Sequence, residues 1–243
     1  MKERLDLLLV EKGIASSRER AKALIMGGSV LVNGVPEIKA GTMVDAGAAI
    51  EMRGHEIPYV SRGGLKLEAA LTYFNINPGG MIAMDVGSST GGFTDCLLQK
   101  GATKVYCIDV GYGQMAWSIR NDPRVVLLER TNIRHLERER VGDTVDIATI
   151  DVSFISLKNV LPVVMGFIRG GGAILALVKP QFEVGKGEVG KGGIVRDEHK
   201  RTNAVNSVKE FAEEAGLKTL GIFLSPVPGQ KGNREYFLYL KKQ

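Results

Sequence analysis

Two lysines and two carboxylates in this chain are placed so that they could act together on a hydroxyl group. Asp151 and Lys179 each follow a short apolar run, Glu235 begins another such run, and Lys66 precedes the first run. A hydroxyl group with a pKa far above neutral needs a base when it attacks an electrophile, and a lysine can serve where neighbouring cations and partial burial lower its pKa. An adjacent carboxylate can orient that lysine. These four residues are therefore the candidate catalytic set.

The elements that would position this set alternate along the second part of the chain. Five apolar runs predict strands at residues 81–86, 104–110, 125–128, 145–150 and 172–178. Four helical patterns fit residues 92–100, 114–120, 156–169 and 200–215. Two further runs, 219–224 and 235–240, have no helix between them and should pair antiparallel. The sequence thus predicts an α/β fold with a seven-stranded, mostly parallel sheet and helices on both faces.

Parallel strands end at one edge of their sheet, and an antiparallel neighbour begins at that same edge. We therefore expect Asp151, Lys179 and Glu235 to meet at the carboxyl edge of the sheet. Each residue alone would fit an ordinary loop cap or a solvated lysine. Four of them arriving in order at one edge favour a catalytic site.

A glycine-rich stretch follows the first predicted strand and suggests a ligand site at the same edge. It reads Asp85-Val86-Gly87-Ser88-Ser89-Thr90-Gly91-Gly92-Phe93-Thr94. Nucleotide-type ligands of such sheets bind beyond the carboxyl ends of the strands, and glycines let the backbone approach them closely. Because Ser89 stands two residues after Gly87, the stretch is not the dinucleotide motif G-x-G-x-x-G. Its Asp-x-Gly-x-x-x-Gly form is typical of class I methyltransferases, which use S-adenosylmethionine.

Several side chains near this stretch could bind the methyl donor. Asp85 could accept from the donor's ammonium group, and amides near Gly91 and Gly92 could donate to its carboxylate. Asp109 could bind the ribose diol or could cap a turn before a glycine, and Asn132 could meet the adenine edge or serve as a turn residue. The candidate donor-binding residues are Asp85, Gly87, Ser89, Gly91, Gly92, Phe93, Asp109 and Asn132.

Residues 1–58 read as a separate small domain, and residues 53–58 as a polar linker. The domain has an amphipathic helix from Arg4, a second helix that begins at Ser16, and an Asn33-Gly34 hairpin signal. The ordered motifs are Arg4-Leu5-Asp6, Ser17-Arg18-Glu19-Arg20-Ala21, Leu24-Ile25, Gly28, Val30-Leu31-Val32-Asn33-Gly34 and Lys39. This pattern resembles the S4 RNA-binding domain.

The net charge of this domain is zero, so RNA binding would depend on local clusters of basic residues. Arg18 and Lys22 share one face of the second helix, which without the S4-like context would be an ordinary solvated face. Residues 185–192 nearly spell a phosphate-binding loop, but Gly192 stands where a serine or threonine is needed. This stretch is either a basic loop that closes over RNA phosphates or a plain flexible loop. The candidate RNA-binding residues are Arg4, Arg18, Arg20, Lys22, Arg62, Lys186 and Lys191.

The order Lys66, Asp151, Lys179, Glu235 resembles the Lys-Asp-Lys-Glu tetrad of FtsJ-like 2′-O-ribose methyltransferases. With an S4-like domain in front, the chain resembles the TlyA/hemolysin A family. The motifs are Ser61-Arg62-Gly63-Gly64-Leu65-Lys66-Leu67, residues 85–95, Asp151-Val152-Ser153-Phe154-Ile155-Ser156-Leu157, Leu177-Val178-Lys179-Pro180-Gln181-Phe182-Glu183 and Gly232-Asn233-Arg234-Glu235.

This resemblance implies an FtsJ-like methyltransferase domain over residues 59–243, with a class I Rossmann-like fold. It also implies S-adenosylmethionine-dependent 2′-O-methylation of cytidine in ribosomal RNA of one or both subunits. By the same resemblance Lys179 is the general base, Asp151 and Lys66 tune and position it, and Glu235 completes the network.

The composition fits a protein with an anionic partner and no metal. The 243-residue chain has a net charge of +5, 44% hydrophobic residues and a pI near 9.1. Cys96 and Cys107 are expected to be buried thiols, and the three histidines lack metal-ligand spacing. No apolar stretch is long enough to span a bilayer, so we expect a cytoplasmic protein with no membrane partner.

Three other functions remain open at this point. A methyltransferase acting on a base nitrogen would usually carry an Asn/Asp-Pro-Pro-Tyr motif after the fourth strand, where this chain has Asp151-Val152-Ser153-Phe154. A membrane-lytic hemolysin-type protein would need a spanning or strongly amphipathic exposed segment. An RNA-binding adaptor with an inactive methyltransferase fold would not need the four catalytic candidates.

Overall fold

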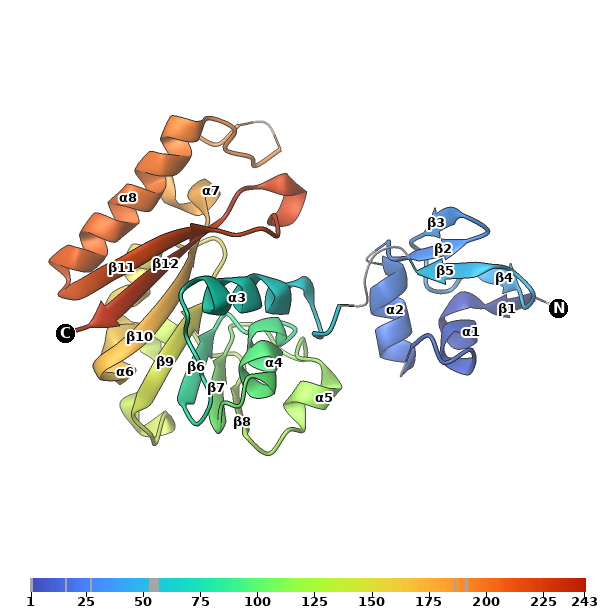
Figure 1. Cartoon of the computed structure of the whole chain (residues 1–243), viewed down its shortest axis with the longest axis horizontal. Coiled ribbons are helices and arrows are strands. Elements are labelled where there is room, and N and C mark those ends of the chain that lie inside the picture. The colour runs from blue at the N-terminus through green and yellow to red at the C-terminus, as the bar shows by residue number, and fades with distance from the viewer. Residues whose placement is uncertain (1, 16, 27, 53–56, 186, 191) are drawn as a thin grey trace. The chain divides into compact units, whose positions relative to one another are not determined.

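The computed structural model of the chain describes residues 2–15, 17–26, 28–52, 57–185, 187–190 and 192–243. The chain divides into two compact units, Met1–Glu56 and Ile57–Gln243, which Figure 1 shows coloured along the sequence. Most of the predicted linker, residues 53–56, lies outside the described residues. The domain boundary predicted after residue 58 stays a prediction.

The N-terminal unit combines two helices with two small antiparallel sheets. The helices are α1 (Leu5–Glu11) and α2 (Arg18–Met26). One sheet pairs β1 (Lys2–Arg4) with β4 (Met43–Asp45), and the other places β2 (Val30–Val32) between β3 (Val35–Glu37) and β5 (Ile50–Met52).

The core of this unit is built from the apolar face predicted for the first helix. Leu5 and Leu9 are fully buried in it. Asn33 and Gly34 have φ of 51° and 78°, the pair of positive values that a tight hairpin turn requires, so the predicted hairpin is confirmed. Arg4 was expected to begin the helix but ends β1 instead, because it pairs with the distant strand β4.

The second unit is built on one seven-stranded sheet with the order β11-β12-β10-β9-β6-β7-β8. The strands are β6 (Ile82–Val86), β7 (Lys104–Ile108), β8 (Val125–Leu128), β9 (Val145–Ile150), β10 (Ile168–Val178), β11 (Leu217–Leu224) and β12 (Tyr236–Lys242). β12 runs antiparallel to both of its neighbours, and β6 to β10 are parallel, so the predicted sheet is confirmed.

Helices cover both faces of this sheet, as Figure 1 shows. They are α3 (Arg62–Tyr73), α4 (Gly92–Gln99), α5 (Trp117–Arg120), α6 (Leu161–Phe167), α7 (Pro180–Glu183) and α8 (Glu198–Glu214). Side chains of α3, α4 and α5 pack in one buried cluster, and side chains of α6 and α8 pack in another. Alternate residues of the central strands point into the two clusters, which is why these strands read as continuous apolar runs.

The helices differ from the prediction in several places: α7 was not predicted, and α5 is shorter than the expected 114–120. α3 was not predicted at all, although it carries Lys66. The helix expected at residues 156–169 is a short 3-10 turn followed by α6, which has Pro162 in its first turn and ends where β10 begins. Cys96 and Cys107 are buried and unpaired, as predicted.

Candidate active site

The ends of β6 and β9 touch where the glycine-rich stretch begins. Gly87 has a φ of 85°, and a Cβ atom on it would lie 2.4 Å from the carbonyl oxygen of Asp151. A contact this short excludes any side chain, so only glycine fits here. The contact holds the start of the glycine-rich loop against the residue that follows β9.

The starts of α3 and α4 also meet at this edge. Ser61 caps α3, and its hydroxyl accepts a hydrogen bond from the amide of Gly63 at 3.3 Å. A Cβ atom on Gly92 would lie 2.1 Å from Ser61 Oγ and 3.0 Å from Gly64 N. Two helix N-termini, each with a partial positive charge from its aligned backbone amides, therefore lie side by side.

Replacement of glycine by alanine should change the free energy of unfolding in opposite directions at Gly92 and at Gly166. Gly92→Ala should lower the free energy of unfolding by about 2 kcal/mol, because the added methyl group overlaps Ser61 Oγ. Gly166→Ala in α6 should raise it by about 0.5 kcal/mol, because nothing lies within 4 Å of the new Cβ atom and alanine favours the helix. Denaturant unfolding measures both. Equal effects of the two variants would contradict the contact.

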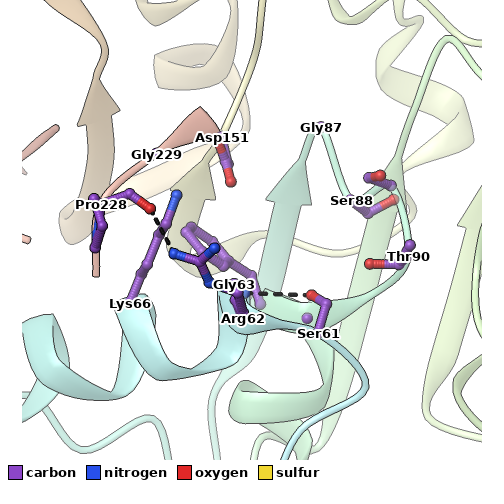
Figure 2. A pocket seen from close by; sticks show the side chains of 13 residues that line it. Ser61, Arg62, Gly63, Lys66, Gly87, Ser88, Thr90, Asp151, Pro228 and Gly229 are labelled. Atoms are coloured by element: carbon purple, nitrogen blue, oxygen red, sulfur yellow. Dashed lines mark hydrogen bonds between the residues drawn. The ribbon is translucent and has the colours of Figure 1, made fainter. Parts of the chain in front are cut away.

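A cavity of about 270 Å³ opens between these helix starts and the strand ends. Its lining residues are Ser61, Arg62, Gly63, Lys66, Gly87, Ser88, Ser89, Thr90, Gly92, Phe93, Asp151, Pro228 and Gly229. Figure 2 shows Lys66 and Asp151 facing the cavity, and Arg62 bridging to the other side by a 2.9 Å hydrogen bond from Nη2 to the carbonyl oxygen of Pro228. Sequence reasoning did not single out Ser61, Gly63, Ser88, Thr90, Pro228 or Gly229.

Two features of the lining suit a polar ligand. Ser88 Oγ is buried and has no hydrogen-bond partner among the described residues. A buried hydroxyl without a partner is destabilising, so such a group suits a ligand that satisfies it. The backbone at Gly87 and Gly92 leaves no room for side chains, which keeps the cavity open beside two helix N-termini.

Asp85 is completely buried beneath this cavity and does not line it. Its two carboxylate oxygens accept hydrogen bonds from Thr94 Oγ1 at 2.7 Å and Thr149 Oγ1 at 3.2 Å. Burial raises the pKa of Asp85 to about 7, with a smaller contribution from the negative charge of Asp151, while the hydrogen bond from Thr94 opposes the rise. The carboxyl group therefore holds β6, α4 and β9 together under the loop.

The raised pKa of Asp85 makes the stability of the second unit depend on pH. The folded protein keeps a proton on this carboxyl group up to about pH 7, whereas the unfolded chain releases it near pH 4. Because the folded state binds more protons in this window, its stability should fall as pH rises from about 4 to about 7, by at most about 4 kcal/mol. Asp85→Asn should lose this contribution. Denaturant unfolding at pH 5 and pH 8 tests it, and the same pH dependence in both proteins would contradict it.

Asp109 lies at the end of β7 and connects two loops. Its Oδ2 accepts from the amide of Ser89 at 2.7 Å, and its Oδ1 accepts from the amide of Gly111 at 2.6 Å. Asn132 caps a short 3-10 helix, where its Oδ1 accepts from the amide of Arg134 at 3.1 Å. Neither side chain lines the 270 Å³ cavity, so their roles toward a donor remain proposals.

Lys179 and Asp151 form one ion pair at the carboxyl edge. The two atoms Lys179 Nζ and Asp151 Oδ1 lie 2.5 Å apart, and the ammonium donates a hydrogen bond to Ser153 Oγ at 3.0 Å. Only about a tenth of the Lys179 side chain is exposed, so water screens this pair weakly.

Lys66 and Glu235 form a second ion pair, with 2.6 Å between Nζ and Oε2. The Lys66 side chain is 12% exposed and that of Glu235 is 3% exposed. Gly229 lies directly against the carboxylate, since a Cβ atom there would clash with Glu235 Oε1. The loop before β12 therefore closes over the pair.

The strand register brings the two pairs together. Val178 is opposite Tyr236 in the β10–β12 pair, so Lys179 and Glu235 flank the same position on neighbouring strands. Ile150 pairs with Val86 in the β9–β6 ladder, so Asp151 follows β9 beside Gly87. Lys66 reaches this edge from α3. The structure thus brings the four candidate catalytic residues to one rim of the sheet.

The basic residues proposed for RNA lie in different settings. Arg4 and Arg18 both donate to the buried carboxylate of Asp6, at 3.0 Å and 2.9 Å, and these contacts hold the pKa of Asp6 well below its usual range. Nearly half of each arginine side chain remains exposed. Arg20 and Lys22 lie on α2, and Arg62 lines the cavity. Lys186 and Lys191 lie outside the described residues.

Comparison with known families matches both parts of the chain. The FtsJ-like methyltransferase family matches residues 59–242, and the S4 domain matches residues 3–50. The chain belongs to the FtsJ-like methyltransferase family. The predicted S4-like beginning and class I methyltransferase fold are confirmed.

Three proteins similar to this FtsJ-like methyltransferase cover nearly all of it. The 16S/23S rRNA (cytidine-2′-O)-methyltransferase TlyA of Mycobacterium tuberculosis is 49% identical over 99% of this chain and 90% of its own length. Hemolysin A of Brachyspira hyodysenteriae is 39% identical over 97% of this chain and 98% of its own length. The solved structure of a hemolysin candidate from Streptococcus thermophilus has a TM-score of 0.79 and 42% identity, covering 100% of this chain and 89% of that one.

Two of these proteins are named as hemolysins, a name that implies contact with a membrane. Within the described ranges, no helix has the length and apolar character needed to cross a membrane. No group of three histidine, cysteine, aspartate or glutamate side chains in those ranges is placed to hold a metal ion.

Proposed function

We propose that this protein transfers a methyl group from S-adenosylmethionine to the ribose 2′-hydroxyl of a cytidine in ribosomal RNA. The observation that carries the proposal is the pair of lysine–carboxylate contacts, Lys179–Asp151 and Lys66–Glu235, at the rim of one cavity. The similarity to the tuberculosis TlyA enzyme supports cytidine in ribosomal RNA as the substrate.

The lining of the cavity fits the amino-acid end of the donor. Ser88 Oγ and the amides at the starts of α3 and α4 would bind its polar groups, and Gly87, Ser89, Gly92 and Phe93 would shape the surrounding wall. Gly91 precedes α4 with a φ of 91° and does not line the cavity, so it would act by turning the loop into the helix. Asp109 would bind the donor's ribose and Asn132 its adenine edge, while Asp85 would act from below by holding the loop. When bound, S-adenosylmethionine supplies an electrophilic methyl group.

Lys179 is the residue we assign as general base. Lys179 Nζ would accept the proton of the ribose 2′-hydroxyl as the ribose oxygen takes up the methyl group, whose bond to the sulfonium sulfur breaks in the same displacement. Asp151 and Ser153 hold the Lys179 amine in place by contacts of 2.5 Å and 3.0 Å. The Lys66–Glu235 pair fixes the opposite wall, and Gly229 brings the β12 loop against it.

Phe154 gives a reason to favour an extruded nucleotide as the substrate. Its side chain is 91% exposed and its φ of 62° is a strained value for a residue with a side chain. The ring centroids of Phe154 and Phe182 lie 4.9 Å apart. In the sequence Phe154 comes three residues after Asp151, and Phe182 three residues after Lys179. An exposed aromatic ring in a strained backbone next to a catalytic rim suits stacking on a nucleic-acid base.

Removing the ring of Phe154 should weaken RNA binding without affecting the donor. Phe154→Leu should raise the dissociation constant for the RNA substrate about tenfold, the typical loss for one base–aromatic stack. Phe154→Tyr keeps the ring and should bind RNA like the wild type. Donor affinity, measured by calorimetry, should be the same in all three proteins. Equal RNA affinity of the leucine and tyrosine variants would exclude stacking.

The reaction type is tested by the chemistry of the product. Purified protein is incubated with labelled S-adenosylmethionine and ribosomal RNA, the RNA is digested to nucleosides, and these are analysed by mass. Label in 2′-O-methylcytidine supports the proposal, and label in a methylated base contradicts it. An absence of transfer with intact donor binding would favour the inactive adaptor.

We further propose that the protein works in the cytoplasm, where ribosomal RNA is available to its S4 domain.

A further inference from the structure

A second cavity, of about 390 Å³, lies next to the catalytic rim in the same unit. One side is formed by the segment that leads into α8, which includes Arg196, and by Arg201 in the first turns of α8. The other side is formed by the loop before β12, which includes Lys231 and Arg234. No residue of the proposed catalytic set or donor site lines it.

The charged side chains that line this second cavity are all positive. Arg196, Arg201, Lys231 and Arg234 are its charged residues, and none of them forms an ion pair with a carboxylate among the described residues. The neighbouring carboxylates are engaged elsewhere. Asp197 caps α8 by accepting from the amide of Lys200 at 3.1 Å, and Glu235 pairs with Lys66.

Arg201 provides the evidence that this cavity binds a ligand. Its side chain is about nine-tenths buried, and its Nη1 donates to the carbonyl oxygens of Val195 at 3.1 Å and Arg196 at 2.6 Å. Its Nε is buried and has no acceptor in the described part of the chain. A buried guanidinium without a counter-ion is strongly destabilising, so an anion that enters the cavity would satisfy both the charge and the free donor.

The walls of the cavity are held in place before any ligand binds. Asn233 Nδ2 donates to the carbonyl oxygen of Gly193 at 2.9 Å, and Asn233 Oδ1 accepts from the amide of Val195 at 3.3 Å. The carbonyl oxygen of Asn233 accepts from the amide of Gly229 at 2.9 Å. Asn233 therefore joins the segment before α8 to the loop before β12, and binding does not require these walls to assemble first.

We propose that this second cavity is a phosphate-binding site that takes one phosphodiester group of the RNA substrate. A guanidinium matches phosphate oxygens in both charge and geometry, and three further cations surround it. The same short loop serves both cavities, since Pro228 and Gly229 line the first, Lys231 and Arg234 line the second, and Glu235 pairs with Lys66. A phosphate held here would fix the strand beside the acceptor ribose. This assignment of the phosphate to RNA rests on the function proposed above.

RNA binding at several salt concentrations tests the site. The Arg196→Gln/Arg234→Gln double variant removes two exposed cations from the cavity and leaves Arg201 in place. The matched control is Lys218→Gln/Lys241→Gln, which removes the same charge from residues paired at the far ends of β11 and β12. The cavity variant should bind RNA about tenfold more weakly near 0.1 M salt. The plot of log association constant against log salt concentration should become less steep by about 1. Equal slopes in the two double variants would overturn the proposal.

The resonance of the Arg201 Nε–H group distinguishes the source of the phosphate. A short RNA oligonucleotide should shift this signal in the wild type, and the shift should be lost in the cavity variant. A response to inorganic phosphate together with no response to RNA would assign the site to a free anion and overturn the RNA assignment. No response to either probe would remove the site altogether.

These measurements do not depend on catalysis. If the wild type transfers no methyl group to ribose, the proposed reaction fails while the Arg201 signal and the salt slope still report on the phosphate site. If methyl transfer proceeds and neither RNA nor phosphate reaches Arg201, only the phosphate site fails.

Discussion

Replacing Lys179 with alanine is expected to lower the rate of methyl transfer to RNA by about 100-fold or more, while donor affinity stays at the wild-type value. The amine is the proton acceptor in the proposed reaction, and positioned acid–base groups commonly contribute about 10²- to 10⁴-fold. Single-turnover transfer of a labelled methyl group measures the rate, and calorimetry measures the donor affinity.

The chain offers a matched control for this experiment. Lys104 forms an ion pair with Asp143 at 2.7 Å, but it lies at the start of β7, on the edge of the sheet opposite the proposed site. Lys104→Ala therefore removes a lysine from a short but more exposed ion pair and should leave transfer unchanged. Wild-type transfer by the Lys179→Ala protein would refute the assignment of the base.

Removing Lys66 is expected to destabilise the second unit by about 3 kcal/mol. Lys66→Ala leaves the carboxylate of Glu235, which is 3% exposed, without its 2.6 Å partner, and an unpaired buried charge is costly. Denaturant unfolding of this unit gives the change in free energy. Methyl transfer should fall as well, because the loop that carries Gly229 packs on this carboxylate.

A double-variant cycle separates the lost charge pair from simple truncation. Lys66→Met combined with Glu235→Gln replaces both charges and should recover most of the stability lost in Lys66→Met alone. Recovery of stability without recovery of transfer would assign the pair a role in the reaction beyond packing. If Lys66→Met alone were as stable as the wild type, the pair would have no structural role.

The sheet and the edge that carries the candidate site could be predicted because the strands are buried on both faces. Continuous apolar runs located the strands through β9 to within a few residues, and the rule for parallel strands then placed Asp151 and Lys179 at one edge. The absence of a helix between the last two runs predicted the reversed strand that brings Glu235 there. These inferences need only the backbone direction of each strand.

The helix that was missed, α3, has a weak helical signal in the sequence. Gly63 and Gly64 weaken the helical signal of α3, yet Gly64 is required because a Cβ atom there would overlap the ring of Tyr59. Ser61 as a cap and Leu67 and Leu71 on one face were the available signals for this helix.

For the candidate donor-site residues, the sequence predicted their places along the strands and loops. It did not predict which groups their side chains contact. Asp85 lies next to the end of its strand, but its side chain points into the interior toward Thr94 and Thr149, which only the packing of α4 and β9 determines. Ser88, whose buried hydroxyl has no described partner, looks in the sequence like any other loop serine.

A lysine-centred rim beside the glycine-rich cavity is proposed to methylate ribose in ribosomal RNA. The most direct test is to map 2′-O-methylated positions in ribosomal RNA from cells that contain the wild-type protein, the Lys179→Ala variant, or neither. We predict that specific cytidines carry the 2′-O-methyl group only with the wild type. An identical methylation map in all three would contradict the claim.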